Sequence, residues 1–236
     1  MMAGWTVSEL EDNHPVFSRP LGLTEIGFAW DGKFNGTADC IQHLQLRLLN
    51  KHDEATFSDA NIIRSWLSLK RRYPMLCAQI RSHDGGEKFL VEEKRVAGLN
   101  HGEVTFRSVP SAAEARQVPL DVLNGTRPLS DEMLSRIYIL RPMGDPCTLH
   151  VCIVMAHCII DGTASTSIQR CLLDTLSSRN EAPVMSLEER LSMVIPLENR
   201  TTSWELSPAK RRWRQAIGYA VYQVRSSRRN VSLQQS

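Results

Sequence analysis

The sequence contains no long apolar run, no secretory signal and no repeat or low-complexity tract. Its longest notable apolar stretch, residues 151–156, falls far short of the roughly 18 to 20 residues that a membrane-spanning helix needs. Residues 1–11 have neither the basic start nor the apolar core of a signal peptide. These absences argue against a membrane span and favour a cytoplasmic location.

Charge imbalance and paired cysteines are also missing. The 28 basic and 26 acidic residues leave a net charge of +2, whereas a general nucleic-acid binder normally has a strong basic excess. None of the six cysteines forms a C-x-x-C pair, so neither a zinc site nor a thioredoxin-like site is indicated. Reduced thiols are expected, and Cys152 and Cys158 lie among apolar neighbours as small hydrophobic residues. With 42% apolar and 23% charged residues, the chain has the composition of an ordinary folded protein.

Hydrophobic periodicity predicts strands and helices over the first 180 residues. Strands are expected at 44–49, 75–80, 88–92, 104–109, 135–140 and 148–156, with a Gly-containing turn at 84–86. Helices are expected from the N-cap Ser58 to Tyr73, over 111–116 with an end before Pro119, and after Gly162 with a cap at Thr163, Ser165 or Thr166. The run at 148–156 is apolar enough to be a central strand, and no strand is expected beyond residue 160.

The C-terminal region predicts two further helices, over 186–194 and 208–224. The second is amphipathic and basic, with Trp213 and Ile217 on its apolar face and Lys210 and Arg212 among its charges. A membrane-surface helix or an RNA-binding tail would have this pattern, but a solvated helix packed on the rest of the protein is the interpretation we favour.

One segment carries residues with chemical potential: His157, Asp161 and Gly162 follow the predicted central strand and precede a helix. Catalytic groups commonly lie at such a strand-to-helix junction. A neutral imidazole can take a proton from an alcohol, amine or thiol that attacks an activated carbonyl such as a thioester. The aspartate would anchor the loop through a backbone donor or an arginine, for which Arg136 and Arg141 are candidates, and the glycine would allow a tight turn.

The pattern His157-x-x-x-Asp161-Gly162 after an apolar strand resembles the signature of the HxxxD-type acyltransferase superfamily. That superfamily includes chloramphenicol acetyltransferase, condensation domains of peptide synthetases and fungal CoA-dependent acyltransferases. Residues 19–25 resemble the entry segment of the fungal members, and residues 67–80 resemble their helix-then-strand stretch. In that stretch the family's usual histidine and arginine are replaced, since the chain has Tyr73-Pro74 and then Leu76-Cys77.

The resemblance covers residues 15–218 and implies an α+β fold, the two-layer sandwich of chloramphenicol acetyltransferase, as the N-terminal half of the usual two-half enzyme. It implies a half at 1–180, and a helical crossover segment with a basic tail at 181–236. His157 would be the general base, Asp161 a structural residue and Gly162 the turn residue. An acyl-CoA would be the co-substrate, with no bound cofactor or metal, and a small hydroxyl or amine compound from secondary metabolism would accept the acyl group.

Two alternatives remain open. The chain has the length of one half plus a crossover. It is therefore either an enzyme completed by a second-half chain or by forming a homo-oligomer, or it is a catalytically incomplete binding or interaction module. A metal site of His150, His157 and Asp161 is the other alternative, although two histidines seven residues apart on a strand point to opposite faces.

Overall fold

The computed structural model describes residues 4–9, 14–49, 51–83, 86–178 and 185–196, and parts of 207–220. The chain divides into two compact units, Met1–Pro196 and Leu197–Ser236. In the second unit the described residues from 208 to 220 are helical, as the sequence predicts, whereas the rest of the expected basic helix lies outside the described residues. No helix among the described residues is long and apolar enough to cross a bilayer.

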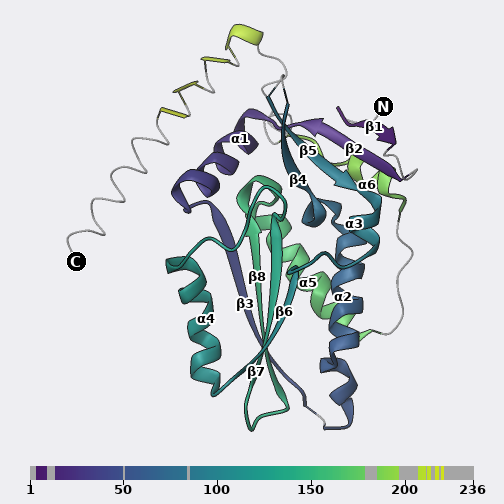
Figure 1. Cartoon of the computed structure of the whole chain (residues 1–236), viewed down its shortest axis with the longest axis vertical. Coiled ribbons are helices and arrows are strands. Elements are labelled where there is room, and N and C mark those ends of the chain that lie inside the picture. Colours follow the sequence, from purple (N-terminus) through teal and green to yellow (C-terminus); the bar gives the residue numbers. More distant parts are fainter. Residues whose placement is uncertain are drawn as a thin grey trace, which may run out of the picture. The chain divides into compact units, whose positions relative to one another are not determined.

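The first unit contains two four-stranded sheets (Figure 1). The first is antiparallel and has the order β1 (Thr6–Glu9), β2 (Pro15–Pro20), β5 (Gly86–Glu92), β4 (Gln79–His83). The second has the order β3 (Asp39–Arg47), β8 (Thr148–Ala156), β7 (Ser135–Pro142), β6 (Val104–Val109), with a parallel pairing only between β6 and β7. The predicted α+β class is confirmed.

Helices connect and cover these strands. They are α1 (Leu23–Trp30), α2 (Asp59–Arg72), α3 (Glu93–Ala97), α4 (Ala112–Asn124), α5 (Gly162–Ser177) and α6 (Leu187–Ser192). The chain also forms a π-helix, η1 (Asp31–Asn35), and three 3₁₀ helices among the described residues, η2 (Lys51–Phe57), η3 (Pro74–Cys77) and η4 (His157–Ile159). The predicted helix after Ser58 is confirmed with its cap, because the Ser58 hydroxyl accepts the Asn61 N–H.

The two faces of the second sheet are covered by different elements. Residues 149, 151, 153 and 155 of β8 pack against apolar side chains of α2 and α5. The alternate residues 152, 154 and 156 of β8 face the opposite side of the second sheet, where they share a core with the first sheet. Helix α4 covers another part of this same face of the second sheet. Every residue of β8 is buried, so the predicted central strand is confirmed.

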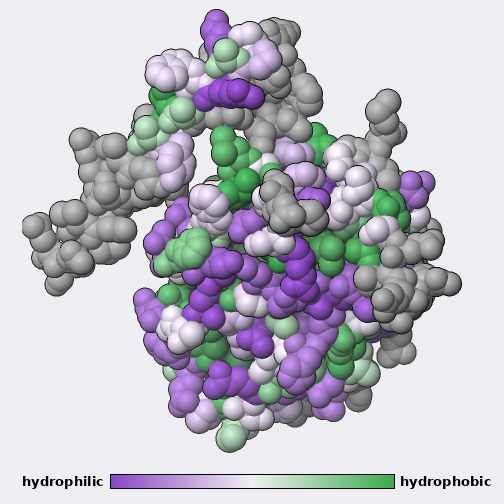
Figure 2. Space-filling view, turned by 45° about the horizontal axis from the view of Figure 1, so that its top comes forward, coloured by the Kyte–Doolittle hydropathy of each residue, from purple (hydrophilic) through white to green (hydrophobic). Residues whose placement is uncertain are grey.

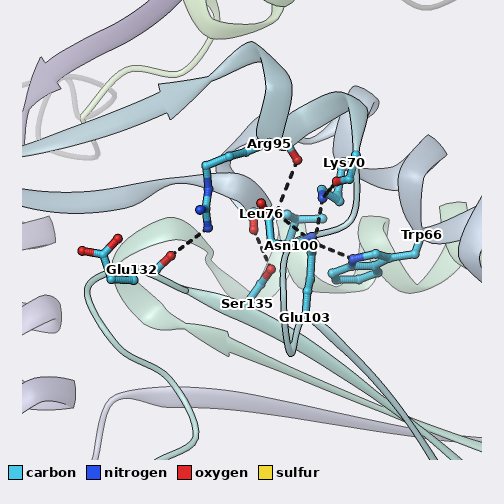
Figure 3. Close-up of polar contacts among 9 residues, drawn as sticks. Trp66, Lys70, Leu76, Arg95, Asn100, Glu103, Glu132 and Ser135 are labelled. Atoms are coloured by element: carbon cyan, nitrogen blue, oxygen red, sulfur yellow. Dashed lines mark hydrogen bonds and ion pairs between the residues drawn. The ribbon is translucent and has the colours of Figure 1, made fainter. Parts of the chain in front are cut away.

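A buried ion pair ties α2 to the segment before β6 (Figure 3). The Lys70 ammonium lies 2.8 Å from a Glu103 carboxylate oxygen and donates a second hydrogen bond to the Gly98 carbonyl. Trp66 donates to the same carboxylate at 2.9 Å, and Asn100 donates to it through its backbone and side-chain nitrogens. Glu103 is therefore a buried anion surrounded by donors from two segments.

Three local predictions are wrong. Residues 75–77 belong to the 3₁₀ helix η3 and not to a strand. In a short run in which every residue is apolar and buried, hydrophobic periodicity cannot distinguish a strand from a helical turn. Helix α4 continues through Pro119 to Asn124, because Val118 and Pro119 are buried and their packing offsets the missing backbone hydrogen bond. The cap of α5 is Asp161, not Thr163, Ser165 or Thr166.

Candidate active site

Backbone hydrogen bonds to the residues directly before β7 and β3 hold the chain at His157, where β8 ends. The Ala156 N–H donates to the Leu134 carbonyl at 2.9 Å, and the His157 N–H donates to the Ala38 carbonyl at 3.0 Å. The chain then turns sharply through η4, and α5 begins at Gly162. Strand, turn and helix thus meet at His157 as the sequence predicts.

The imidazole of His157 lies against an aromatic ring from α1. Its ring is stacked on that of Phe28, with 4.0 Å between centroids and 8° between planes. The side chain is half-buried, and its Nδ1 atom is buried with no hydrogen-bond partner. The ring orientation is therefore set by stacking and by the backbone of η4, without a carboxylate partner on Nδ1.

The entry segment at residues 19–25 positions the helix that carries Phe28. The buried Arg19 guanidinium donates to both oxygens of Glu25, each at 2.7 Å, and Glu25 also accepts the Gly22 N–H at 2.6 Å. The side chains of Arg19 and Glu25 are only 2% and 12% exposed, so this two-point ion pair is largely desolvated. It fixes the first turn of α1, directly before the turn that carries Phe28, and no periodic signal in the sequence indicated α1.

Asp161 is the N-cap of α5. Its carboxylate accepts the Ala164 N–H at 2.7 Å, and its carbonyl accepts the Ser165 N–H at 2.9 Å. Of the two partners left open by the sequence, the structure shows the backbone donor. Arg136 instead donates to the Gly102 and Pro128 carbonyls, and Arg141 pairs with Asp59 on a different helix.

Gly162 has an ordinary role in this geometry. It is the first residue of α5, and an added Cβ would meet no atom within 4 Å. Its φ angle lies outside the left-handed region, so the turn after η4 does not sterically require glycine.

Removing the Asp161 cap should destabilise the protein moderately. We expect Asp161→Ala to lower the free energy of unfolding by about 1 kcal/mol, because the Ala164 N–H loses its partner at the positive end of α5. Asparagine caps as well as aspartate, so Asp161→Asn should stay close to wild type. Urea denaturation of the two variants measures this difference, and equal losses in both would mean that the negative charge matters and not the cap.

The cysteine beside His157 is not placed as a nucleophile. Burial raises the pKa of the Cys158 thiol to about 12, and burial does the same for Cys152. Both thiols are therefore protonated at neutral pH. All six cysteines are free, and the interpretation of Cys152 and Cys158 as buried hydrophobic residues is confirmed.

His150 pairs with another histidine and not with His157. Its Nδ1 lies 2.9 Å from Nε2 of His43 on β3, while its own Nε2 is buried without a partner. Among the described residues no group of three or more His, Cys, Asp or Glu side chains is arranged to hold a metal ion. The His150, His157 and Asp161 set does not form such a group.

The His43–His150 pair should make stability depend on pH. Burial lowers the pKa of both rings below 6.5; the Arg116 guanidinium of α4 lowers both further, and His43 lowers that of His150. Near and below pH 6.5 the unfolded chain therefore binds more protons at these two histidines than the folded chain does. The free energy of unfolding is highest above that pH and decreases as the pH falls below it. Denaturant titrations from about pH 7.5 to about pH 5.5 should show this fall, and His150→Gln should reduce it. The exposed-residue variant His101→Gln is the matched control; an equal fall in all three proteins would contradict the assignment.

The architecture is that of chloramphenicol acetyltransferase-like and condensation domains, and the chain corresponds to about half of one. The chain matches TRI3 trichothecene 15-O-acetyltransferase from Fusarium sporotrichioides with a TM-score of 0.66 and 11% identity, over 93% of this chain and 48% of that one. It matches a double mutant of the starter condensation domain of the rhizomide synthetase RzmA with a TM-score of 0.55 and 12% identity, over 72% of this chain and 40% of that one.

A third match is the four-domain nonribosomal peptide synthetase AB3403, with a TM-score of 0.56 and 13% identity, over 81% of this chain and 14% of that one. No protein-family model matches the sequence, and no curated protein matches it. The resemblance inferred from the HxxxDG segment is thus confirmed at the level of the fold.

Proposed function

We propose that this chain supplies the catalytic histidine of an acyltransferase that moves an acyl group from acyl-CoA to a small alcohol or amine. The observation that carries the proposal is the place of His157: a half-buried imidazole at the end of the central strand β8, stacked on Phe28, with its backbone N–H bonded to Ala38 directly before β3. The fold shared with an acetyltransferase and with condensation domains supports the same reaction class.

The base would be Nε2 of His157, since Nδ1 is buried. Nε2 would take the proton from the acceptor hydroxyl or amine while the oxygen or nitrogen of the acceptor attacks the thioester carbonyl. The carbon–sulfur bond of the thioester would then break, and the CoA thiolate would leave. Asp161 would not contact the reacting groups; it would act indirectly, by fixing the start of α5 and hence the end of η4. No bound cofactor or metal is part of this proposal; acyl-CoA is a substrate.

A second half would be needed to complete the site. The chain spans 48% of the matched acetyltransferase and 40% of the matched condensation domain. Next to His157, α1 and η1 expose the apolar side chains of Leu23, Trp30 and Phe34, of which Phe34 is 71% exposed. On the face drawn in Figure 2, hydrophilic residues predominate and hydrophobic ones are mostly scattered among them. We propose that another chain or a second copy of this chain covers α1 and η1, and that residues 181–236 form the crossover to the second half. We also propose that the protein works in the cytoplasm.

The test is an acyl-CoA turnover assay on the purified chain, with alcohol and amine acceptors and with gel filtration of the same sample. Free CoA should be measured by chromatography, because a thiol reagent would also react with the partly exposed thiols of Cys40 and Cys147. Release that exceeds the blank and is lost in His157→Ala supports the proposal. The runner-up, a catalytically incomplete binding or interaction module, is favoured if wild type and His157→Ala release CoA equally slowly.

A further inference from the structure

The strongest unassigned feature near His157 is an ion pair between two segments far apart in the sequence. Arg127, in the loop after α4, donates through Nε and Nη2 to the two oxygens of Asp39 at 2.8 and 2.9 Å. The side chains are 17% and 10% exposed. Such a two-point, mostly desolvated pair has a fixed geometry, unlike the loose pairs of an exposed surface.

Asp39 is joined directly to the backbone that holds His157. It is the first residue of β3, where it lies opposite Ala156, and the preceding residue, Ala38, accepts the His157 N–H. A shift of the β3 start would therefore move the hydrogen bond on which the His157 backbone depends. The Arg127 guanidinium restrains that start through its two hydrogen bonds to Asp39.

The same guanidinium also lies against the turn that follows α1. A Cβ added at Gly32 in η1 would stand 2.7 Å from Nη2 of Arg127 and 3.2 Å from a carboxylate oxygen of Asp39. The φ angle of Gly32 is not left-handed, so space and not backbone conformation requires glycine here. Because η1 continues α1, which carries Phe28, the ion pair contacts both the segment whose ring stacks on His157 and the start of β3.

We propose that Asp39 and Arg127 are positioning residues for His157, with Gly32 leaving the space that they need. The pair has no net charge of its own, so it acts by holding the η1 turn and the start of β3 in register around the histidine. It does not touch the reacting atoms. This role rests on the proposed function only for its effect on turnover; the geometric role stands without it.

The decisive variant is Arg127→Met, which keeps much of the side-chain length and removes the ion pair. We expect the His157 amide proton to exchange with solvent about tenfold faster, and the proton NMR contacts between the Phe28 and His157 rings to weaken. Arg127→Lys should restore part of the protection. Arg141→Met is the matched control, because it removes an ion pair with Asp59 at the other end of the second sheet; it should leave both readouts unchanged.

Gly32→Ala provides a second route to the same result, since its methyl group must displace the guanidinium. Far-UV circular dichroism confirms that each variant is folded. Unchanged His157 exchange and ring contacts in folded Arg127→Met and Gly32→Ala would overturn the proposal. If wild type transfers acyl groups, Arg127→Met should lower kcat more than it raises the KM for acyl-CoA. If wild type and His157→Ala release CoA equally slowly, the isolated chain is the incomplete module, and the NMR readouts still decide this inference by themselves.

Discussion

His157→Ala should lower the rate of CoA release in the presence of an acceptor by about 10² to 10⁴-fold. The reason is that an alcohol or amine cannot attack a thioester efficiently while it keeps its proton, and among the described residues no other imidazole stands at the end of β8. The measurement is the initial rate of acyl transfer, followed by chromatography, at saturating acyl-CoA. The KM for acyl-CoA should change little, because the imidazole acts on the acceptor.

The matched control is His101→Ala, which removes an exposed histidine from the turn before β6. It should retain the wild-type rate. His157→Gln gives a second comparison, since it keeps a polar side chain without a base of suitable strength. Full activity in His157→Ala or His157→Gln would contradict the role of His157 even if the chain is an active acyltransferase.

Lys70→Met should be the most destabilising of the substitutions considered. It removes the ammonium from a fully buried ion pair and leaves the Glu103 carboxylate buried, where both side chains are at most 2% exposed. Breaking a buried pair from one side typically costs about 3 to 5 kcal/mol. The free energy of unfolding measured in guanidinium chloride should fall by this amount, although Trp66 and Asn100 still donate to the carboxylate (Figure 3).

Two comparisons test the reason for that loss. Lys94→Met removes a Lys from an ion pair with Glu92 whose lysine is 46% exposed, and it should change the free energy of unfolding by less than about 1 kcal/mol. The double variant Lys70→Met/Glu103→Gln should be more stable than Lys70→Met alone, because the uncompensated charge is gone. A loss in Lys70→Met no larger than that in Lys94→Met would show that the buried charge is not what matters.

Elements with a clear period were predictable. The helix over Asp59–Arg72 has an apolar face at helical spacing and a serine cap, and the strand over Val104–Val109 was predicted with its observed bounds. The central strand β8 was evident because nearly all of its residues are apolar or small; His150, which is buried too, is the exception. In each of these cases neighbouring residues alone carry the signal.

The elements around the entry segment were not predictable. In β2 the buried residues include Arg19, which a hydrophobic pattern counts as exposed. Its burial depends on the Glu25 carboxylate, to which both ends of the guanidinium donate. Helix α1 buries few of its apolar side chains completely and leaves Leu23 and Trp30 half exposed. Its position depends on the ion pair at its start, which sequence periodicity does not record.

The sequence by itself determined the chemistry available at the end of β8: a histidine, an aspartate and a cysteine among apolar neighbours. That the aspartate caps α5 was decided by the structure. Only the tertiary structure decided the partners of these groups. Phe28 reaches His157, and Arg127 reaches Asp39 across 88 residues, because sheet pairing brings the ends of β3 and β8 together beside α1. Spacing along the chain specifies neighbours within one element, whereas contacts between elements depend on packing that no local pattern encodes.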